Sequence, residues 1–424
     1  MADRFTASAA APAFTPCLMT LTPALPISAK PAIPAVAILF LAFAAFGTGI
    51  SLRVADALLP HLATEFAVGL GRASYVITCY SVAYGLAQLF FGPLGDRFGK
   101  YRVIAWACGA CGLTSTLCGL APDFPTLLTA RLLAGATAAA VIPLAMAWIG
   151  DVIDYERRQS VLARFLIGQI LGLSAGVWVG GFAGDHLNWR LPFFVIGGGY
   201  VAICIALLSV NRRLPAHARQ LRAVTGNVVR DTLKEFSLVL AVPWARIVLG
   251  SVFLEGGFLY GAFAFISSHL HRVHGVSLSN AGAMVMLFGI GGVLFAALSA
   301  MLVRRLGEVG LAAWGGVLLG GSLFMVGVAP SWVWAIPGCF FTGVGFYMVH
   351  NTLQTNATQM APERRGVAVS AFASCFFMGQ SAGVALAGML VERIGTGAVI
   401  AIFACAVMLV SLNFSRLRAC KLHA

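Results

Sequence analysis

Long apolar runs separated by short charged turns constrain this chain more than any other feature. A helix needs about 20 apolar residues to cross a bilayer, and twelve runs of this kind can be drawn along the sequence. They lie near residues 36–59, 73–92, 103–121, 127–149, 160–184, 191–210, 244–268, 280–303, 309–329, 332–355, 367–390 and 395–414. We therefore predict an all-α integral membrane protein with twelve membrane-spanning helices.

The composition excludes a water-soluble fold. Of the 424 residues, 59% are hydrophobic and only 10% are charged, whereas a soluble protein is about half apolar and about a quarter charged. So few charged side chains cannot cover a surface in water, and lipid must surround most of the chain. The ten cysteines lie mostly inside apolar runs, where they act as small hydrophobic residues. We predict no metal site and no cofactor.

The distribution of positive charge predicts the orientation in the membrane. Membrane proteins concentrate Lys and Arg in cytoplasmic loops. If the N-terminus is cytoplasmic, 20 of the 28 Lys and Arg residues are cytoplasmic as well. Four lie in outer loops (Arg72, Arg190, Arg272 and Arg393), and four lie in or beside spans (Arg53, Arg131, Arg164 and Arg246). Both termini are then cytoplasmic, and the net charge of +13 is explained without nucleic acid as a partner.

An internal repeat divides the chain into two halves. A shift of 207 residues aligns 156–158 with 363–365 and 174–177 with 381–384, with ten identities over residues 156–181. Two matched six-helix halves suit a transporter in which one half rocks against the other. The predicted parts are a disordered cytoplasmic tail (1–35), an N-terminal bundle (36–210), a cytoplasmic linker (211–243), a C-terminal bundle (244–415) and a cytoplasmic tail (416–424).

The linker between the two halves allows two interpretations. Its second part, Val228 to Leu240, has the pattern of an amphipathic helix that lies on the inner leaflet. The alternative is a solvated linker without regular structure.

A glycine-rich turn after the second predicted helix carries the most specific motif. It runs from Gly92 to Arg102 and reads GPLGDRFGKYR. A phosphate-binding loop requires G-x-x-x-x-G-K-[ST], and Leu94 and Tyr101 break that pattern. The turn instead resembles the signature loop of the major facilitator superfamily, G-x-L-x-D-R-x-G-R/K-x-x-R.

Further segments carry the same resemblance, which covers about residues 36–415. Arg131 to Gly135 resembles the R-x-x-x-G of the family, and Trp189-Arg190 resembles its common W-R. The resemblance implies two six-helix bundles around a central cavity that opens to one side at a time. It also implies that the signature loop joins the halves on the cytoplasmic side in the outward-facing state. The loop residues so implicated are Gly92, Asp96, Arg97, Gly99 and Lys100.

The fifth predicted helix carries a glycine at every fourth position. Gly172, Gly176 and Gly180 therefore share one face, and small residues at this spacing let another helix approach closely. The segment resembles the antiporter motif G-x-x-x-G-P-x-x-G-G of exporters in the family, but Val177 replaces the Pro. Helix packing and an antiporter motif both remain possible interpretations, and the direction of transport stays open.

Two acidic residues fall well within the predicted spans, Asp56 in the first and Glu255 in the seventh. A charge at the bilayer centre costs roughly 2.5–3.5 kcal/mol on insertion scales, which argues for a function or a structural partner. Arg131 lies at a depth similar to that of Asp56, and Arg53 precedes Asp56 on the same helical face. The Asp-x-x-x-Pro segment that ends at Pro60 resembles the first helix of some multidrug/proton antiporters.

These charged residues predict proton coupling. A carboxyl that alternates between an apolar environment and a nearby cation can take up a proton on one side and release it on the other. Glu255 is the predicted cavity carboxyl, and Asp56 and Arg131 are the predicted coupling pair. The alternative is a fixed ion pair of Asp56 with Arg131 or Arg53 that holds helices together.

Other polar side chains within the spans could line a substrate cavity, although polar groups also join membrane helices. The candidates are Arg53, Tyr80, Tyr84, Gln88, Gln169, Tyr260, Tyr347, His350, Asn351 and Gln380. His350 can titrate near neutral pH. We interpret the cluster of His269, His271 and His274 as a solvated outer loop and not as a zinc site, which needs fixed geometry and usually a fourth ligand.

The predicted function is proton-coupled export of a small organic molecule across a bacterial inner membrane by a monomer. Proton-coupled uptake of an organic acid or sugar is the alternative, and Val177 favours it. A channel or a membrane-embedded enzyme is a further alternative, but the sequence contains no clustered nucleophile, base or metal ligands. The acids permit a cationic substrate and the arginines an anionic one, so the substrate cannot be read from the sequence.

Overall fold

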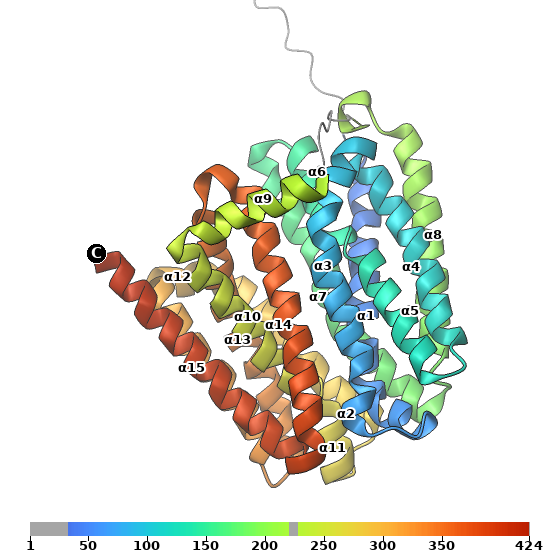
Figure 1. Cartoon of the computed structure of the whole chain (residues 1–424), viewed down its shortest axis with the longest axis vertical. Helices are drawn as coiled ribbons and strands as arrows, with labels where there is room; N and C mark the ends of the chain where they lie inside the picture. The colour runs from blue at the N-terminus through green and yellow to red at the C-terminus, as the bar shows by residue number, and fades with distance from the viewer. Residues whose placement is uncertain (1–32, 220–227, 424) are drawn as a thin grey trace, which may run out of the picture. The chain divides into compact units, whose positions relative to one another are not determined.

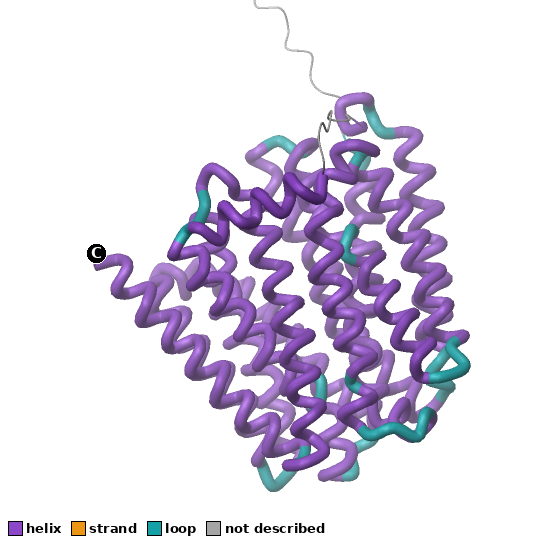
Figure 2. The backbone as a smooth tube through the Cα atoms, in the orientation of Figure 1, coloured by secondary structure: helices purple, strands orange, loops and turns teal. Residues whose placement is uncertain are grey.

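The computed structural model describes residues 33–219 and 228–423, and all regular structure in these ranges is helical (Figures 1 and 2). The all-α prediction is confirmed. Most of the predicted N-terminal tail lies outside the described residues, as do residues 220–227 of the linker.

The helices fall into two runs along the chain, joined by one helix. The first run is α1 (Ala35–Glu65), α2 (Leu70–Ala73), α3 (Tyr75–Phe98), α4 (Lys100–Leu120), α5 (Phe124–Ala138), α6 (Val141–Val152), α7 (Tyr155–His186) and α8 (Leu191–Arg213), followed by the 3-10 turn η1 (Ala216–Arg219). The joining helix is α9 (Val228–Ala241). The second run is α10 (Pro243–Phe263), α11 (Ile266–His274), α12 (Leu278–Val328), α13 (Ala335–Gln359), α14 (Arg365–Ile394) and α15 (Thr396–His423), with short 3-10 turns before α13 and α14.

Eleven stretches of the described chain are long and apolar enough to cross a membrane. One of them, α12, has 51 residues, or about 77 Å at 1.5 Å per residue, which is more than two bilayer crossings. Gly307 interrupts it with φ 61° and ψ −178°, a conformation that glycine adopts without a steric penalty. Residues 278–306 and 308–328 are therefore separate spans. The total is the predicted twelve, and the break falls between the two predicted runs.

Two spans that the sequence predicts as uninterrupted are broken near their middle or end. The fourth breaks between α5 and α6 at Ala139 and Ala140, and the seventh breaks between α10 and α11 at Ala264 and Phe265. The seventh span then continues as α11, so His269 lies in a helix. Its ring is buried, with Nδ1 2.9 Å from the Thr396 hydroxyl. The prediction of a solvated loop at these histidines is therefore wrong.

The 207-residue repeat is present in the packing of the helices. A Cβ at Gly172 of α7 would overlap the carbonyl oxygen of Phe46 in α1. A Cβ at Gly379 of α14 would likewise overlap the carbonyl oxygen of Phe253 in α10. The shift of 207 residues relates Gly172 to Gly379 and also Phe46 to Phe253. The glycine stripe of α7, including Gly176 and Gly180, therefore lies directly against the backbone of α1.

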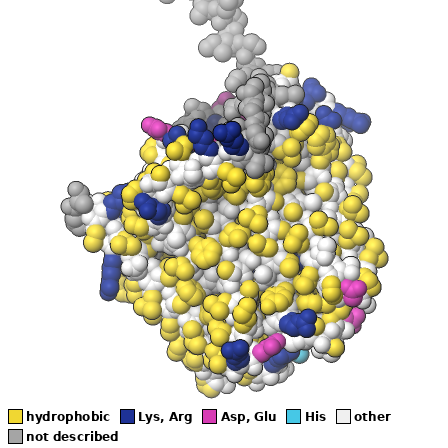
Figure 3. All heavy atoms as spheres, in the orientation of Figure 1, with side chains coloured by type: hydrophobic (Ala, Val, Ile, Leu, Met, Phe, Trp, Pro, Cys, Tyr) yellow, Lys and Arg dark blue, Asp and Glu magenta, His cyan; other side chains and the backbone are white. Residues whose placement is uncertain are grey.

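The first and last described helices begin and end at the same end of the bundle, which we term the termini end (Figure 1). On the face drawn in Figure 3, apolar side chains cover the middle, and Lys and Arg gather toward this end. Helix α9 lies here, against α3, α10 and α14, and its Glu235 accepts a hydrogen bond from Arg364 at 2.8 Å. The predicted helix over Val228 to Leu240 is confirmed, and its contact with a membrane stays a prediction.

Candidate functional site

A buried ion pair lies in the middle of α1, where the two halves meet. Arg53 Nη1 is 2.9 Å from Asp56 Oδ2, and both side chains are almost fully buried. The Arg53 guanidinium lies over the ring of Tyr260 at 3.9 Å and near that of Phe263 at 5.1 Å, both from α10 in the second half. The second carboxylate oxygen, Asp56 Oδ1, has no hydrogen-bond partner among the described atoms. This pair thus joins charge on one half to aromatic rings on the other.

Arg131 of α5 contacts backbone oxygen atoms instead of Asp56. It donates hydrogen bonds to the carbonyl oxygens of Val76 at 3.2 Å and Ser51 at 3.0 Å, and its guanidinium lies over the ring of Tyr80 at 4.2 Å. These contacts tie α5 to α1 and α3. Of the two pairings that the sequence left open for Asp56, the structure contains the one with Arg53.

A second buried acid, Glu255 of α10, pairs with His350 of α13. Glu255 is fully buried, and its Oε2 lies 2.9 Å from His350 Nδ1. The other oxygen, Oε1, has no partner among the described atoms. The rings of Phe346, Phe372 and Phe376 lie 4.9, 5.3 and 4.8 Å from the His350 ring. The sequence identified both titratable residues separately, and the structure brings them together.

Several of the predicted cavity residues connect the two halves. Gln380 of α14 donates from Nε2 to the Ser81 hydroxyl of α3 at 2.8 Å. The ring of Tyr84 in α3 contacts that of Phe377 in α14, with 4.3 Å between centroids. Gln88, one turn further along α3, is buried, and its Nε2 has no partner among the described atoms. The contact between α3 and α14 is therefore both polar and aromatic.

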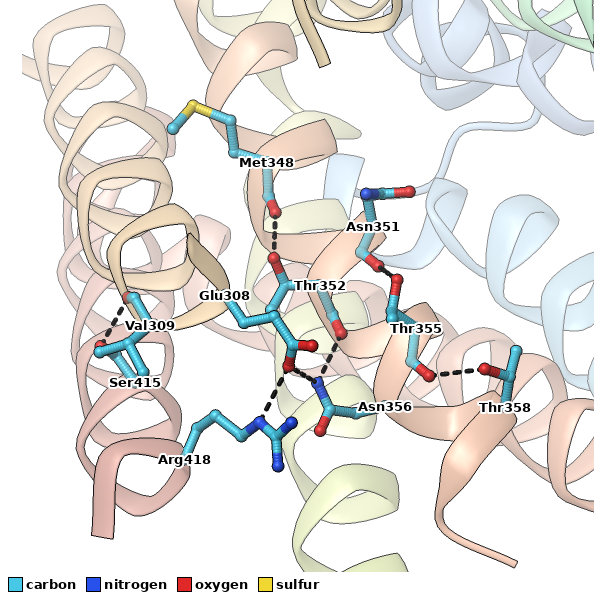
Figure 4. A network of polar contacts seen from close by, with 10 residues as sticks. All are labelled: Glu308, Val309, Met348, Asn351, Thr352, Thr355, Asn356, Thr358, Ser415 and Arg418. Carbon is cyan, nitrogen blue, oxygen red and sulfur yellow. Dashed lines mark hydrogen bonds and ion pairs between the residues drawn. The ribbon is translucent and has the colours of Figure 1, made fainter. Parts of the chain in front are cut away.

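Three other candidates lie apart from these contacts. Gln169 and Asn351 are partly exposed, and Figure 4 shows the Asn351 side chain turned away from the neighbouring polar network. Tyr347 packs its ring against Gly292 of α12. The structure assigns these three residues no contact with either buried acid.

A small cavity separates the halves beside the Arg53 side chain. Its volume is about 10 Å³, and its walls include Ser174, Tyr260 and Phe288. A space of this size holds about one water molecule. The halves therefore meet closely at this level.

Two carboxylates join the halves at the end opposite the termini, and neither was predicted from the sequence. Asp185, near the end of α7, accepts hydrogen bonds from Leu278 N at 3.1 Å, Ser279 N at 2.6 Å and Ser279 Oγ at 2.6 Å, at the start of α12. Glu392, near the end of α14, accepts one from Gly71 N of α2 at 3.2 Å. The 207-residue shift relates Asp185 to Glu392 and Leu278 to Gly71. We term these two contacts the clasps. The sequence does contain a signal for these two acids. If the repeat is extended by four residues beyond Gly181, Asp185 aligns with Glu392.

Comparison with known proteins identifies the family. The model of the Major Facilitator Superfamily matches residues 41–384. The chain belongs to this superfamily. It is therefore a membrane transporter of small molecules and not an enzyme, which removes the alternative of a membrane-embedded enzyme.

Relatives and solved structures agree with this family. The MFS-type transporter YceJ of Bacillus subtilis is 24% identical over 79% of this chain and 84% of its own length. The puromycin resistance protein pur8 of Streptomyces alboniger is 30% identical over 56% of this chain and 50% of its own length. The crystal structure of a mutant of the nucleoside transporter NupG superposes with a TM-score of 0.72 over 89% of this chain and 98% of its own, at 15% identity.

The signature loop of this superfamily member lies at the termini end and makes its ion pairs within the first half. Lys100 Nζ is 2.9 Å from Asp96 Oδ1 and 2.6 Å from Asp151 Oδ2 of α6. Gly99, with φ 89°, reverses the chain between α3 and α4. The Arg97 guanidinium lies near the ring of Phe98 at 5.3 Å, and Gly92 has open space where a Cβ would lie. In this conformation the clasps join the two halves at the opposite end of the bundle. The ion pairs described above for the signature loop lie within the first half and do not join the halves.

A polar network occupies the corresponding place in the second half of the transporter (Figure 4). Glu308 follows the bend at Gly307, and its Oε2 accepts hydrogen bonds from Asn356 Nδ2 and Arg418 Nε, both at 2.9 Å. The network ties α12 to α13 and α15. Since α15 continues to His423, Arg418 belongs to the last helix and not to a separate tail.

Proposed function

We propose that this transporter exports small organic molecules with an apolar, aromatic part, in exchange for protons. The observation that carries the proposal is the buried pair of Glu255 and His350. A carboxylate in apolar surroundings needs a cation, several hydrogen-bond donors or a proton. Glu255 has one partner for two oxygens, and that partner is an imidazole, a group that exists in a neutral and a protonated form. The pair is therefore suited to exchange a proton when its surroundings change.

The aromatic rings beside this pair support an organic substrate. Three phenylalanine rings surround His350, and the ring of Tyr260 lies 5.5 Å from that of Phe376. Aromatic rings bury a large apolar area and stack on flat ligands. A substrate with such a part could replace contacts that the rings now make with each other.

Two observations bear on the direction of transport, and they favour opposite directions. The similarity to pur8, named a puromycin resistance protein, supports export. The valine at position 177, where the antiporter motif has proline, favours proton-coupled uptake as the second candidate. We propose that the termini end is cytoplasmic, as the charge distribution predicts, so that the clasps close the outer side.

Everted membrane vesicles test both coupling and direction. An energised vesicle is acid inside, and exchange of an added substrate for internal protons relieves the quenching of a pH-sensitive dye. With puromycin and ethidium as probes, we expect the wild type to relieve quenching and Glu255→Gln to lose most of this response. Glu308→Gln makes the same chemical change outside the central pair and should retain it. A Glu255→Gln variant that matches the wild type would contradict the proposed proton site. Probe-dependent alkalinisation of the medium around right-side-out vesicles, caused by protons that enter together with the probe, would favour uptake.

A further inference from the structure

A second and larger cavity opens at the termini end of the first half, away from the buried acids. Its volume is about 290 Å³. The ends of α3, α4 and α8 and the turn η1 form its walls. Residues that line it include Arg97, Phe98, Tyr101, Arg102, Asn211 and Arg219.

The charge around this cavity favours an anionic ligand. Three of its lining residues are arginines, and none of the lining residues is acidic. Two carboxylates of the same end of the first half, Asp96 and Asp151, both pair with Lys100. In the part of the chain that the structure describes, no ion pair joins Arg97, Arg102 or Arg219 to an acid. Several guanidinium groups around one cavity are suited to the oxygen atoms of a phosphate.

The walls of the cavity are fixed by buried contacts. Tyr101 donates a hydrogen bond from its hydroxyl to the carbonyl oxygen of Ala37 at 3.3 Å, and its ring lies 4.8 Å from that of Trp148. Trp148 Nε1 in turn donates to the carbonyl oxygen of Ala218 at 3.0 Å. This bond holds η1, and with it Arg219, over the cavity. The arginines therefore converge on a site whose backbone is already in place.

The position of the cavity points to a ligand that comes from the membrane. The spanning segments that border it end at Phe98, begin at Lys100 and end at Arg213, so the cavity lies where the spans reach the membrane surface. An exposed apolar stripe leads away from it along α4. Arg102 lies over the ring of Trp106 at 4.5 Å. Below it, on the same helical face, the exposed residues are Trp106, Leu113, Leu117 and Leu120.

We propose that this cavity binds the phosphate of an anionic phospholipid headgroup, with the acyl chains along the exposed face of α4. Basic pockets between spanning helices on the cytoplasmic side suit such headgroups. The choline cation of a zwitterionic lipid would lie close to the arginines and be repelled, so the site prefers phosphatidylglycerol to phosphatidylcholine. Since Arg97 and Gly99 also belong to the signature loop, the bound lipid contacts this loop directly.

Native mass spectrometry of the purified full-length protein, titrated with phosphatidylglycerol or phosphatidylcholine, tests this proposal. The test variant is Arg102→Gln/Arg219→Gln, which leaves the signature loop intact. The control is Arg304→Gln/Arg305→Gln, which makes the same charge change at exposed arginines of the same end in the second half. Each arginine near an anionic headgroup contributes about fivefold in affinity, so the test variant should bind phosphatidylglycerol about thirtyfold more weakly.

The outcomes distinguish a headgroup site from misfolding and from a site for free phosphate. We expect the control to keep the wild-type affinity, and Arg102→Lys/Arg219→Lys to recover most of it, which excludes misfolding as the cause of the loss. Equal losses in test variant and control, or no loss in either, would overturn the site. If millimolar inorganic phosphate displaces phosphatidylglycerol, or binds alone with the same dependence on Arg102 and Arg219, the ligand is free phosphate and the lipid proposal is wrong.

Discussion

Replacement of Asp185 by Asn should shift the transporter toward a conformation that is open at the end opposite the termini. The Asp185 carboxylate accepts three hydrogen bonds from Leu278 and Ser279 at the first turn of α12, where the helix dipole also favours negative charge. A hydrogen bond to a charged group contributes about 1.5–3 kcal/mol when buried. Asp185 is exposed, so solvent reduces this contribution, and the amide of Asn keeps one acceptor oxygen.

The expected loss for Asp185→Asn is therefore about 1–2 kcal/mol, or about a five- to thirtyfold change in the ratio of closed to open conformations. Single-molecule fluorescence energy transfer measures this ratio. Donor and acceptor labels at Leu187 and Val273 place one dye on an exposed position of each half at this end. We expect a larger population with a long distance between the dyes in the variant than in the wild type.

Asp123→Asn is a matched control for this experiment. Asp123 also caps a helix at the same end, with Thr126 N donating to its Oδ1 at 2.8 Å, but that helix is in the same half. Its substitution should leave the dye distances unchanged. Glu392→Gln, which removes the charge from a clasp with one hydrogen bond, should produce a smaller shift, and the double variant should produce the sum because the clasps are separate. Equal shifts for Asp123→Asn and Asp185→Asn would refute a latch between the halves.

Three further predictions follow from single contacts. His350→Gln removes the imidazole partner of a buried acid and should lower probe-driven proton release in everted vesicles more than tenfold, whereas a rate within twofold of the wild type would exclude a role in coupling. Gly172→Leu places a side chain against the α1 backbone and should abolish a monodisperse size-exclusion peak, while Gly92→Leu, which has open space, should retain it. The hydrogen bond from the Thr126 backbone lowers the pKa of Asp123, so its cap should be fully formed above the ordinary pKa of an aspartate and lost only as pH falls through the lowered one. Hydrogen exchange at the Thr126 amide, compared with the intrinsic exchange rate at each pH, measures whether the cap is formed. A loss of protection at a pH still above the ordinary pKa of an aspartate would contradict the prediction.

The number and order of the spans could be predicted because the length of an apolar run fixes whether it crosses a bilayer. The turn at Gly307 could be predicted because charged residues and a glycine lie between two such runs. The break at Ala139 has a local signal that the prediction did not use, since Pro143 has no N–H to bond to the Ala139 carbonyl oxygen four residues before it. The break at Ala264 could not be predicted, because no proline or paired glycine lies at this position. Such breaks depend on which neighbours a helix must pack around. The burial of His269 has the same origin, since it follows from the continuation of the span as α11.

The candidate site was predictable in its residues and only partly in its contacts. Depth along a helix can be counted from the sequence, which placed Asp56 beside two arginines. The rotation of α5 relative to α1 decides that Arg131 reaches backbone oxygens, and rotation is a property of packing. The contact between Glu255 and His350 joins positions 95 residues apart, and spacing along the chain carries no information about such a pair.

The internal repeat distinguishes the contacts that let the two halves pack and move from the residues that can carry chemistry. The glycine–backbone contacts and the clasps occur twice, related by the same 207-residue shift, as expected for parts that let two matched halves pack and rock. The acids do not repeat, since the shift places Thr48 opposite Glu255 and Phe263 opposite Asp56. The same shift places Tyr260 opposite Arg53, and these two residues are in contact. Equivalent residues can touch only near the pseudo-symmetry axis, so the Arg53–Asp56 pair lies where relative motion of the halves changes its surroundings most directly.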